Sequence, residues 1–261
     1  MRTYQDLLKN RHDEELFDYY FTSQLALVDT QADSVAAVGK PAIFSHVEAS
    51  PDGNHMLVAW EHRPYSYLHP SYDFPKEVEV WNRQGTVEYK LASLPLAEQV
   101  PIEGVPTGPR DYEWRSTAPA TLVWAEALDG GDPRKKVPHR DRVLMLDSPF
   151  REQPREIAKT QHRFAGGRGG SGLVWGEQPN VALLSDYDRD TRHQRVFVIN
   201  VDRPEQTPRL LWDRSVRDRY GDPGTPIMKT LPNGHSVIWQ KGSFIYLTGR
   251  GSSPASWGRR N

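Results

Sequence analysis

The sequence has 261 residues, with 33 lysines and arginines against 34 aspartates and glutamates, and a formal net charge of -1. This balance argues against a dedicated nucleic-acid binder, which usually carries a basic excess. No run of about 18 apolar residues is present, so no transmembrane helix is predicted. The absence of cysteine excludes disulfides, a cysteine nucleophile and thiolate zinc sites.

The first 22 residues carry the clearest helical pattern. Thr3, followed three residues later by Asp6 and then by Leu7 and Leu8, predicts a capped first piece. Acidic residues at 13–15 favour the start of a second short piece, because negative charge stabilises a helix N-terminus. We therefore expect a helical segment over residues 1–22.

Short strand patterns fill the rest of the chain and recur in groups of four. Each group has a turn between its first two strands, and these turns fall near residues 52, 117, 179 and 233. In the first turn, Pro51 presets φ, Asp52 bonds the backbone and Gly53 accepts a positive φ. Four-stranded antiparallel units repeated at roughly 55–65 residues are typical of β-propeller blades, whereas a two-sheet sandwich would lack this recurrence.

The predicted fold is therefore all-β: a partial β-propeller over residues 23–254, with about three complete and two partial blades. We expect residues 24–28 and 35–38 to be outer strands of a blade before the first complete one. Residues 226–248 should begin a blade after the third. Because propellers close with about 4 to 8 blades, the ring is expected to be incomplete, with residues 255–261 as a tail outside it.

Two motifs resemble catalytic or metal-binding sequences without completing them. Ser171 lies in a glycine-rich run, but Leu173 occupies the last glycine position of a nucleophile elbow, and a strand is expected where the elbow needs a helix. Residues 186–190 alternate aspartates as calcium loops do, but Thr191 and Phe197 stand where an EF-hand needs glycine and glutamate. The histidines show no ligand spacing. We predict loops here, with no catalytic residue, metal site or cofactor.

A long charged loop at 129–142 is a candidate binding element. Its basic side chains could attract an anionic peptide or phosphate, or its own aspartates could neutralise them, and both interpretations stay open. Loop residues held on a rigid scaffold often bind ligands. The candidate substrate-binding or steering residues are Arg134, Lys135, Lys136, His139 and Arg140.

The loop at 63–75 is rich in aromatic residues and proline. Its rings could stack on a ligand. The interpretation that we favour is that the loop packs over a neighbouring blade.

Several segments together resemble the propeller region of bacterial and chloroplast glutamyl endopeptidases, a branch of the prolyl oligopeptidase family of serine peptidases. The most specific is the compositionally unusual block at 126–141, EALDGGDPRKKVPHRD. The resemblance extends from residue 2 to about residue 254. The other segments that resemble the family are residues 2–10, 23–29, 63–67, 105–110 and 213–215.

The resemblance implies a propeller that caps an α/β-hydrolase domain, filters access to it and helps to position the peptide. The serine, aspartate and histidine of the triad would lie in that domain, which nothing in this sequence matches, so the chain is expected to be inactive alone. The family's preference for acidic side chains makes the basic loop a candidate for steering acidic peptides. The expected partners are a peptide substrate and the missing hydrolase domain, with no nucleic acid and no membrane.

Two other functions stay open. One is a free-standing propeller-like module that binds a protein or peptide. The other is a glycosidase propeller, although no suitable carboxylate pair is evident in the sequence.

Overall fold

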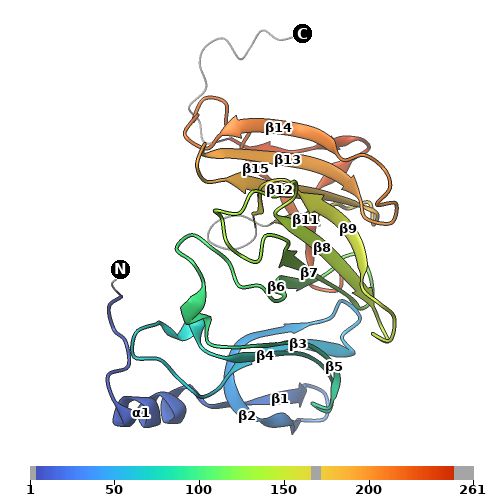
Figure 1. The fold of residues 1–261 in the computed structure, drawn as a ribbon. Coiled ribbons are helices and arrows are strands. Elements are labelled where there is room, and N and C mark those ends of the chain that lie inside the picture. The colour runs from blue at the N-terminus through green and yellow to red at the C-terminus, as the bar shows by residue number, and fades with distance from the viewer. Residues whose placement is uncertain (1–3, 166–171, 250–261) are drawn as a thin grey trace, which may run out of the picture.

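The computed structural model of the protein describes residues 4–165 and 172–249 (Figure 1). Within these residues the helical elements are α1 (Arg11–Phe21) and two single turns of 3-10 helix, Ser71–Asp73 and Ala97–Gln99. None of these described helices is long and apolar enough to span a membrane.

Helix α1 begins after an asparagine cap. The Asn10 side chain accepts a hydrogen bond from the backbone N–H of Asp13 at 3.0 Å, and acidic residues occupy the first turn. Residues 4–10 are not helical, and Asp6 has a φ of 57°. The predicted first helical piece is therefore wrong where it is described, because the effective cap lies seven residues after Thr3.

The first sheet has five antiparallel strands in chain order. Strand β2 pairs with β1 through its first half and with β3 through its second half. Gly39, with a φ of 67°, lies at the register shift near the end of the part paired with β1 and lets the strand bend without ending. The strands are β1 (Ser23–Asp29), β2 (Ser34–Ala49), β3 (His55–Glu61), β4 (Lys76–Asn82) and β5 (Val87–Leu94).

Residues 24–28 and 35–38 pair with each other, as expected of the two outer strands of a partial blade before the first complete one. They form a hairpin that continues directly into the first strand of the first blade.

The second and third sheets follow along the chain, as the colours of Figure 1 show. The second sheet has the order β6-β7-β8-β9, and the third has β12-β13-β14 with both β10 and β11 paired to β12. The strands of the second are β6 (Arg110–Trp114), β7 (Thr121–Ala127), β8 (Asp141–Asp147) and β9 (Arg155–Thr160). Those of the third are β10 (Arg163–Phe164), β11 (Leu173–Trp175), β12 (Val181–Asp188), β13 (His193–Asn200) and β14 (Arg209–Ser215).

The last unit consists of short pairs. Strands β16 and β17 form a hairpin, β18 pairs with β19, and β15 pairs with β20. The strands are β15 (Thr225–Pro226), β16 (Met228–Thr230), β17 (Ser236–Ile238), β18 (Gln240–Lys241), β19 (Phe244–Ile245) and β20 (Leu247–Thr248).

Alternation along the central strands builds two apolar cores. In β7, Leu122 and Trp124 pack into the core shared with the first sheet, whereas Val123 and Ala125 pack into the core shared with the third. Successive side chains of a strand point to opposite faces, so one buried strand supplies both cores. The sheets therefore stack face to face, as propeller blades do, and the predicted all-β, partial β-propeller fold is confirmed.

Candidate functional site at the inner strands

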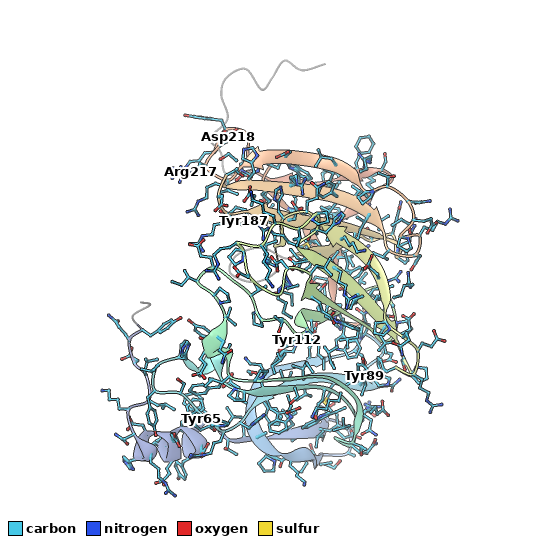
Figure 2. The ribbon with its side chains drawn as sticks, viewed as in Figure 1. Tyr65, Tyr89, Tyr112, Tyr187, Arg217 and Asp218 are labelled. Atoms are coloured by element: carbon cyan, nitrogen blue, oxygen red, sulfur yellow. The ribbon has the colours of Figure 1, made fainter. Side chains whose placement is uncertain are left out.

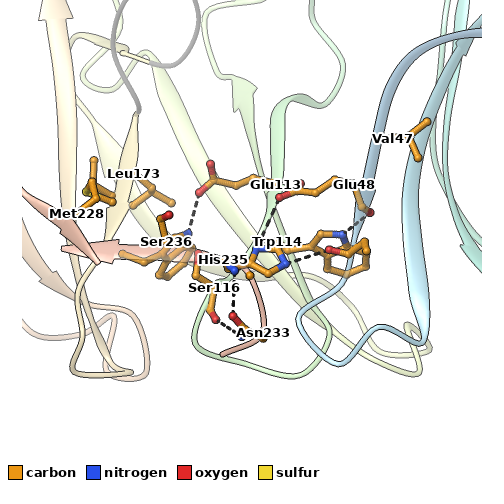
Figure 3. A pocket seen from close by; sticks show the side chains of 14 residues that line it. Val47, Glu48, Glu113, Trp114, Ser116, Leu173, Met228, Asn233, His235 and Ser236 are labelled. Carbon is orange, nitrogen blue, oxygen red and sulfur yellow. Dashed lines mark hydrogen bonds and ion pairs between the residues drawn. The ribbon is translucent and has the colours of Figure 1, made fainter. Parts of the chain in front are cut away.

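The first strands of successive blades converge on one pocket of about 590 Å³. They are the end of β2, β6, β11 and the hairpin β16–β17, and we call them the inner strands. The pocket that they enclose is called the axial pocket below (Figure 3). Its lining residues are Val47, Glu48, Ala49, Glu113, Trp114, Ser116, Leu173, Val174, Trp175, Met228, Asn233, Gly234, His235 and Ser236.

Glu113 is the most perturbed ionisable group of this pocket. Its carboxylate accepts a hydrogen bond of 2.9 Å from the indole Nε1–H of Trp175, which ties β6 to β11. Burial raises the pKa of Glu113 to about 8, and the negative charges of Glu48 and Asp111 act in the same direction. The hydrogen bond from Trp175 opposes this shift only in part.

Glu48 and His235 lie beside Glu113 in the middle of the pocket (Figure 3). His235 Nε2 lies 3.0 Å from the carbonyl oxygen of Ala49, which fixes that nitrogen as the donor because a carbonyl can only accept. His235 Nδ1 then faces a Glu48 carboxylate oxygen at 3.7 Å. The indole Nε1–H of Trp114 donates to the carbonyl oxygen of Glu48 at 3.0 Å. Through the contacts of His235 with Ala49 and Glu48, the last unit is joined to the first across the pocket.

A second pocket, of about 480 Å³, lies where the four repeated turns meet. Asp52 N donates to Pro119 O at 2.9 Å, and Thr117 Oγ1 donates to Pro179 O at 3.1 Å. Ser116 and Asn233 line both pockets. The four turns whose spacing in the sequence indicated blades therefore also lie together in space, where they form a surface rich in proline.

The predicted basic loop lies between β7 and β8, and its arginines are engaged with aspartates. Arg134 pairs with Asp132 at 2.9 Å and holds the pKa of that carboxyl at about 2. Arg140 pairs with the buried Asp129 at 2.9 Å.

The other three predicted residues of this loop carry no such pair. Lys135 and Lys136 are exposed and His139 is partly buried. Within the described part of the chain their side chains make no hydrogen bond or ion pair, although the backbone N–H of Lys135 donates to the carbonyl oxygen of Asp132 at 3.1 Å. The assignment of these residues to substrate binding or steering stays a prediction.

The other sequence candidates have different outcomes. Ser171 lies outside the described residues. Asp186 is buried and pairs with Arg195, and Asp188 accepts a hydrogen bond of 2.8 Å from Thr191 Oγ1. Among the residues that the structure describes, no group of three or more histidine, aspartate or glutamate side chains is placed to hold a metal ion.

The aromatic loop at 63–75 packs on α1 and not on a neighbouring blade. Phe17 of the helix contacts Tyr65 and Phe74, with ring centroids 5.1 and 5.7 Å apart. Arg63 pairs with Asp18 at 2.7 Å, and the Tyr65 hydroxyl also bonds to Asp18. Figure 2 shows Tyr65 beside this helix. The rings of Tyr65 and Phe74 are therefore occupied by packing within the chain, whereas Tyr67 and Tyr72 of the same loop are exposed.

The sequence analysis missed the residues of the axial pocket. A usable signal was present, because most of them lie in the first strand of a predicted blade or in the turn that follows it, and those strands line the centre of a propeller. His235 and Ser236 lie instead at the start of the returning strand of the last unit. Glu113 and Trp175 are 62 residues apart, so only the register between blades could show that they meet.

The fold and the pocket define the class of the chain: a β-propeller segment whose inner strands enclose a cavity. No protein-family model matches the chain. It is 39% identical over 263 residues to the probable glutamyl endopeptidase, chloroplastic, of Oryza sativa subsp. japonica. It is 38% identical over 264 residues to the protein of that name from Arabidopsis thaliana.

Each of these matches covers 97% of this chain but only 27% of the relative. The chain thus spans about a quarter of the length of the curated relatives that it matches, and it is similar to a partial, propeller-like region of them. The resemblance to glutamyl endopeptidases is confirmed.

Likeness to solved structures is slight. Oligogalacturonate lyase in complex with manganese has a TM-score of 0.40 at 12% identity, covering 73% of this chain and 48% of that chain. Kuenenia stuttgartiensis hydrazine synthase has a TM-score of 0.37 at 11% identity, covering 71% of this chain and 48% of that chain.

Proposed function

We propose that this chain is the non-catalytic propeller segment of a glutamyl endopeptidase-like serine peptidase of the prolyl oligopeptidase family. In this role it gates the entry of peptides and positions them for an α/β-hydrolase domain. The similarity to proteins named glutamyl endopeptidase supports the peptidase context. The observation that carries the positioning role is the axial pocket, in which the inner strands of four successive units meet.

The pocket has the chemistry that a peptide-positioning site needs. Apolar walls from Leu173, Trp175 and Met228 accompany carboxyl, amide and hydroxyl groups. Its volume lies within the range of about 300–1,000 Å³ that is common for ligand pockets. An extended peptide offers both apolar side chains and backbone groups to such a surface.

Peptide binding tests this role directly. We expect the purified chain to bind a fluorescent acetyl-Ala-Ala-Glu-Ala-Ala peptide, measured by anisotropy, and Ser236→Trp to weaken binding at least tenfold by filling the pocket. Ser34→Trp is the matched control, because Ser34 is also an exposed serine in a strand but lies in the hairpin β1–β2. Absence of binding, or equal binding by the two variants, would overturn the positioning role.

A separate experiment tests the proposal that the chain is not catalytic. A fluorophosphonate probe, which reacts with activated serines, should leave the purified chain unlabelled as judged by intact-protein mass spectrometry. Labelling of any serine would show that the chain carries its own nucleophile and would contradict this part of the proposal.

A free-standing binding module is the second candidate, and one observation favours it. The hairpin β16–β17 reaches the first unit through His235 and the second through Asn233, and Val237 lies in a core of the second and third sheets. A monodisperse species in size-exclusion chromatography with one cooperative thermal transition would favour the module. Aggregation through open strand edges would favour the first proposal, a propeller segment that needs the rest of a peptidase.

A further inference from the structure

We infer that the axial pocket is a binding site for the cationic group of a peptide, a guanidinium or ammonium, held by the Glu113 carboxylate. Because the occupant is taken to be a peptide, this assignment rests on the proposed function. It deepens that function by naming the group for which the pocket adds affinity, so a peptide that lacks a cation still binds, but more weakly.

The first argument is the charge of the lining. Two carboxyl groups, those of Glu48 and Glu113, line the pocket, and none of its described lining residues is lysine or arginine. The single basic side chain is His235, which is held by the Ala49 carbonyl and faces Glu48. Glu113 is left without a cationic partner among the described residues.

The second argument is the way in which Glu113 is held. One carboxylate oxygen accepts the hydrogen bond from Trp175, so the side chain has a fixed direction. No other hydrogen bond or ion pair is described for this carboxyl group, which leaves further acceptor capacity for a ligand. Glu113 keeps its proton below its pKa of about 8, so a cation is bound with release of that proton, and the affinity for a cationic peptide should rise with pH. The ionised group can accept two parallel hydrogen bonds from a guanidinium, and charge-assisted bonds of this kind are among the strongest in proteins.

The third argument is space. A cavity of about 590 Å³ has room for a long basic side chain together with adjoining backbone. Trp114 and Trp175 contribute to its wall but are only 1% and 4% exposed and pack into the two apolar cores, so neither ring is free to stack on a ligand. Charge, a directed acceptor and available space therefore favour the same class of ligand.

The probes are acetyl-Ala-Arg-Ala-amide and its citrulline analogue, which has nearly the same shape but no charge. Binding is followed on the 15N-labelled chain through the indole N–H signal of Trp175, assigned by its loss in Trp175→Phe. We expect the arginine peptide to bind at least tenfold more tightly than the citrulline peptide. Equal affinities, or no binding by either tripeptide, would overturn the cation assignment, and this comparison needs no variant that might misfold.

Variants then locate the site. Glu113→Gln should lower the affinity for the arginine peptide to that of the citrulline peptide. Glu126→Gln is the matched control, because Glu126 also accepts a 2.9 Å hydrogen bond from an indole, that of Trp124, but lies outside the pocket. Equal loss in both variants, or none in Glu113→Gln, would overturn the assignment.

An acetyl-Ala-Lys-Ala-amide probe and an unacetylated alanine tripeptide amide then show whether a side-chain ammonium or a peptide N-terminus is also accepted. If the acidic peptide of the preceding subsection binds normally while the arginine peptide shows no preference, the proposed function stands and only the cation assignment fails. If no peptide binds, both fail.

Discussion

At the scale of single residues, Glu113 has an ionisable group placed where a charge is poorly solvated. Burial raises its pKa to about 8 from an ordinary value of 4.5, and Glu48 and Asp111 add to the shift. The folded chain therefore keeps this proton over a pH range in which the unfolded chain releases it. By linkage, the folded state loses stability as pH rises through that range, between about 4.5 and about 8.

Glu113→Gln should remove this contribution. Between pH 5 and pH 8.5 the free energy of unfolding of the original chain should fall, relative to that of the variant, by an amount on the order of a few kcal/mol. Urea titrations at both pH values measure the difference, and comparison within one pair of chains cancels the pH-dependent contributions that the two chains share. A parallel pH dependence in both chains would show that Glu113 titrates normally.

At the scale of elements, the blades were predictable because their signals are local. Alternation in β7 and the turn residues at 51–53 act within a few positions, so the sequence shows them directly. The join between the hairpin β1–β2 and the first blade was missed because it depends on contacts distant in sequence. Gly39 lies against the ring of Trp81 in β4, and a Cβ atom at Gly39 would overlap that ring. The pairing of Glu113 with Trp175 was missed for the same reason.

Gly39→Ala tests that close approach, with Gly53→Ala as its control. Both glycines have a positive φ, 67° and 68°, so each substitution should lower the free energy of unfolding by about 1–2 kcal/mol through backbone strain. A Cβ at Gly53 meets nothing within 4 Å, whereas one at Gly39 meets the buried Trp81 ring. Overpacking should therefore remove about 1–3 kcal/mol more in Gly39→Ala, measured by urea unfolding. Equal losses would mean that the bend in β2 does not depend on this contact.

At the scale of the whole molecule, the candidate binding features are separated along the blades. Strand β7 runs from the turn at 115–119, beside the two pockets, to the basic loop at 128–140, so the loop lies at the opposite end of the second sheet. The arginines of the loop are paired with aspartates, whereas the exposed side chains of Lys135 and Lys136 form no ion pair with the described residues. Any long-range attraction of an acidic peptide from this end therefore depends mainly on the two lysines.

Lys135→Gln combined with Lys136→Gln should slow the association of the acetyl-Ala-Ala-Glu-Ala-Ala peptide about two- to fivefold at low ionic strength and flatten its salt dependence. The reason is that steering by exposed charges is screened beyond about 10 Å at 0.1 M salt. Lys40→Gln with Lys241→Gln is the matched control, because both residues are exposed and the net charge changes equally. Stopped-flow rates at several salt concentrations separate the cases: an equal effect of both double variants would assign the attraction to net charge and remove the basic loop from the proposed route of the substrate.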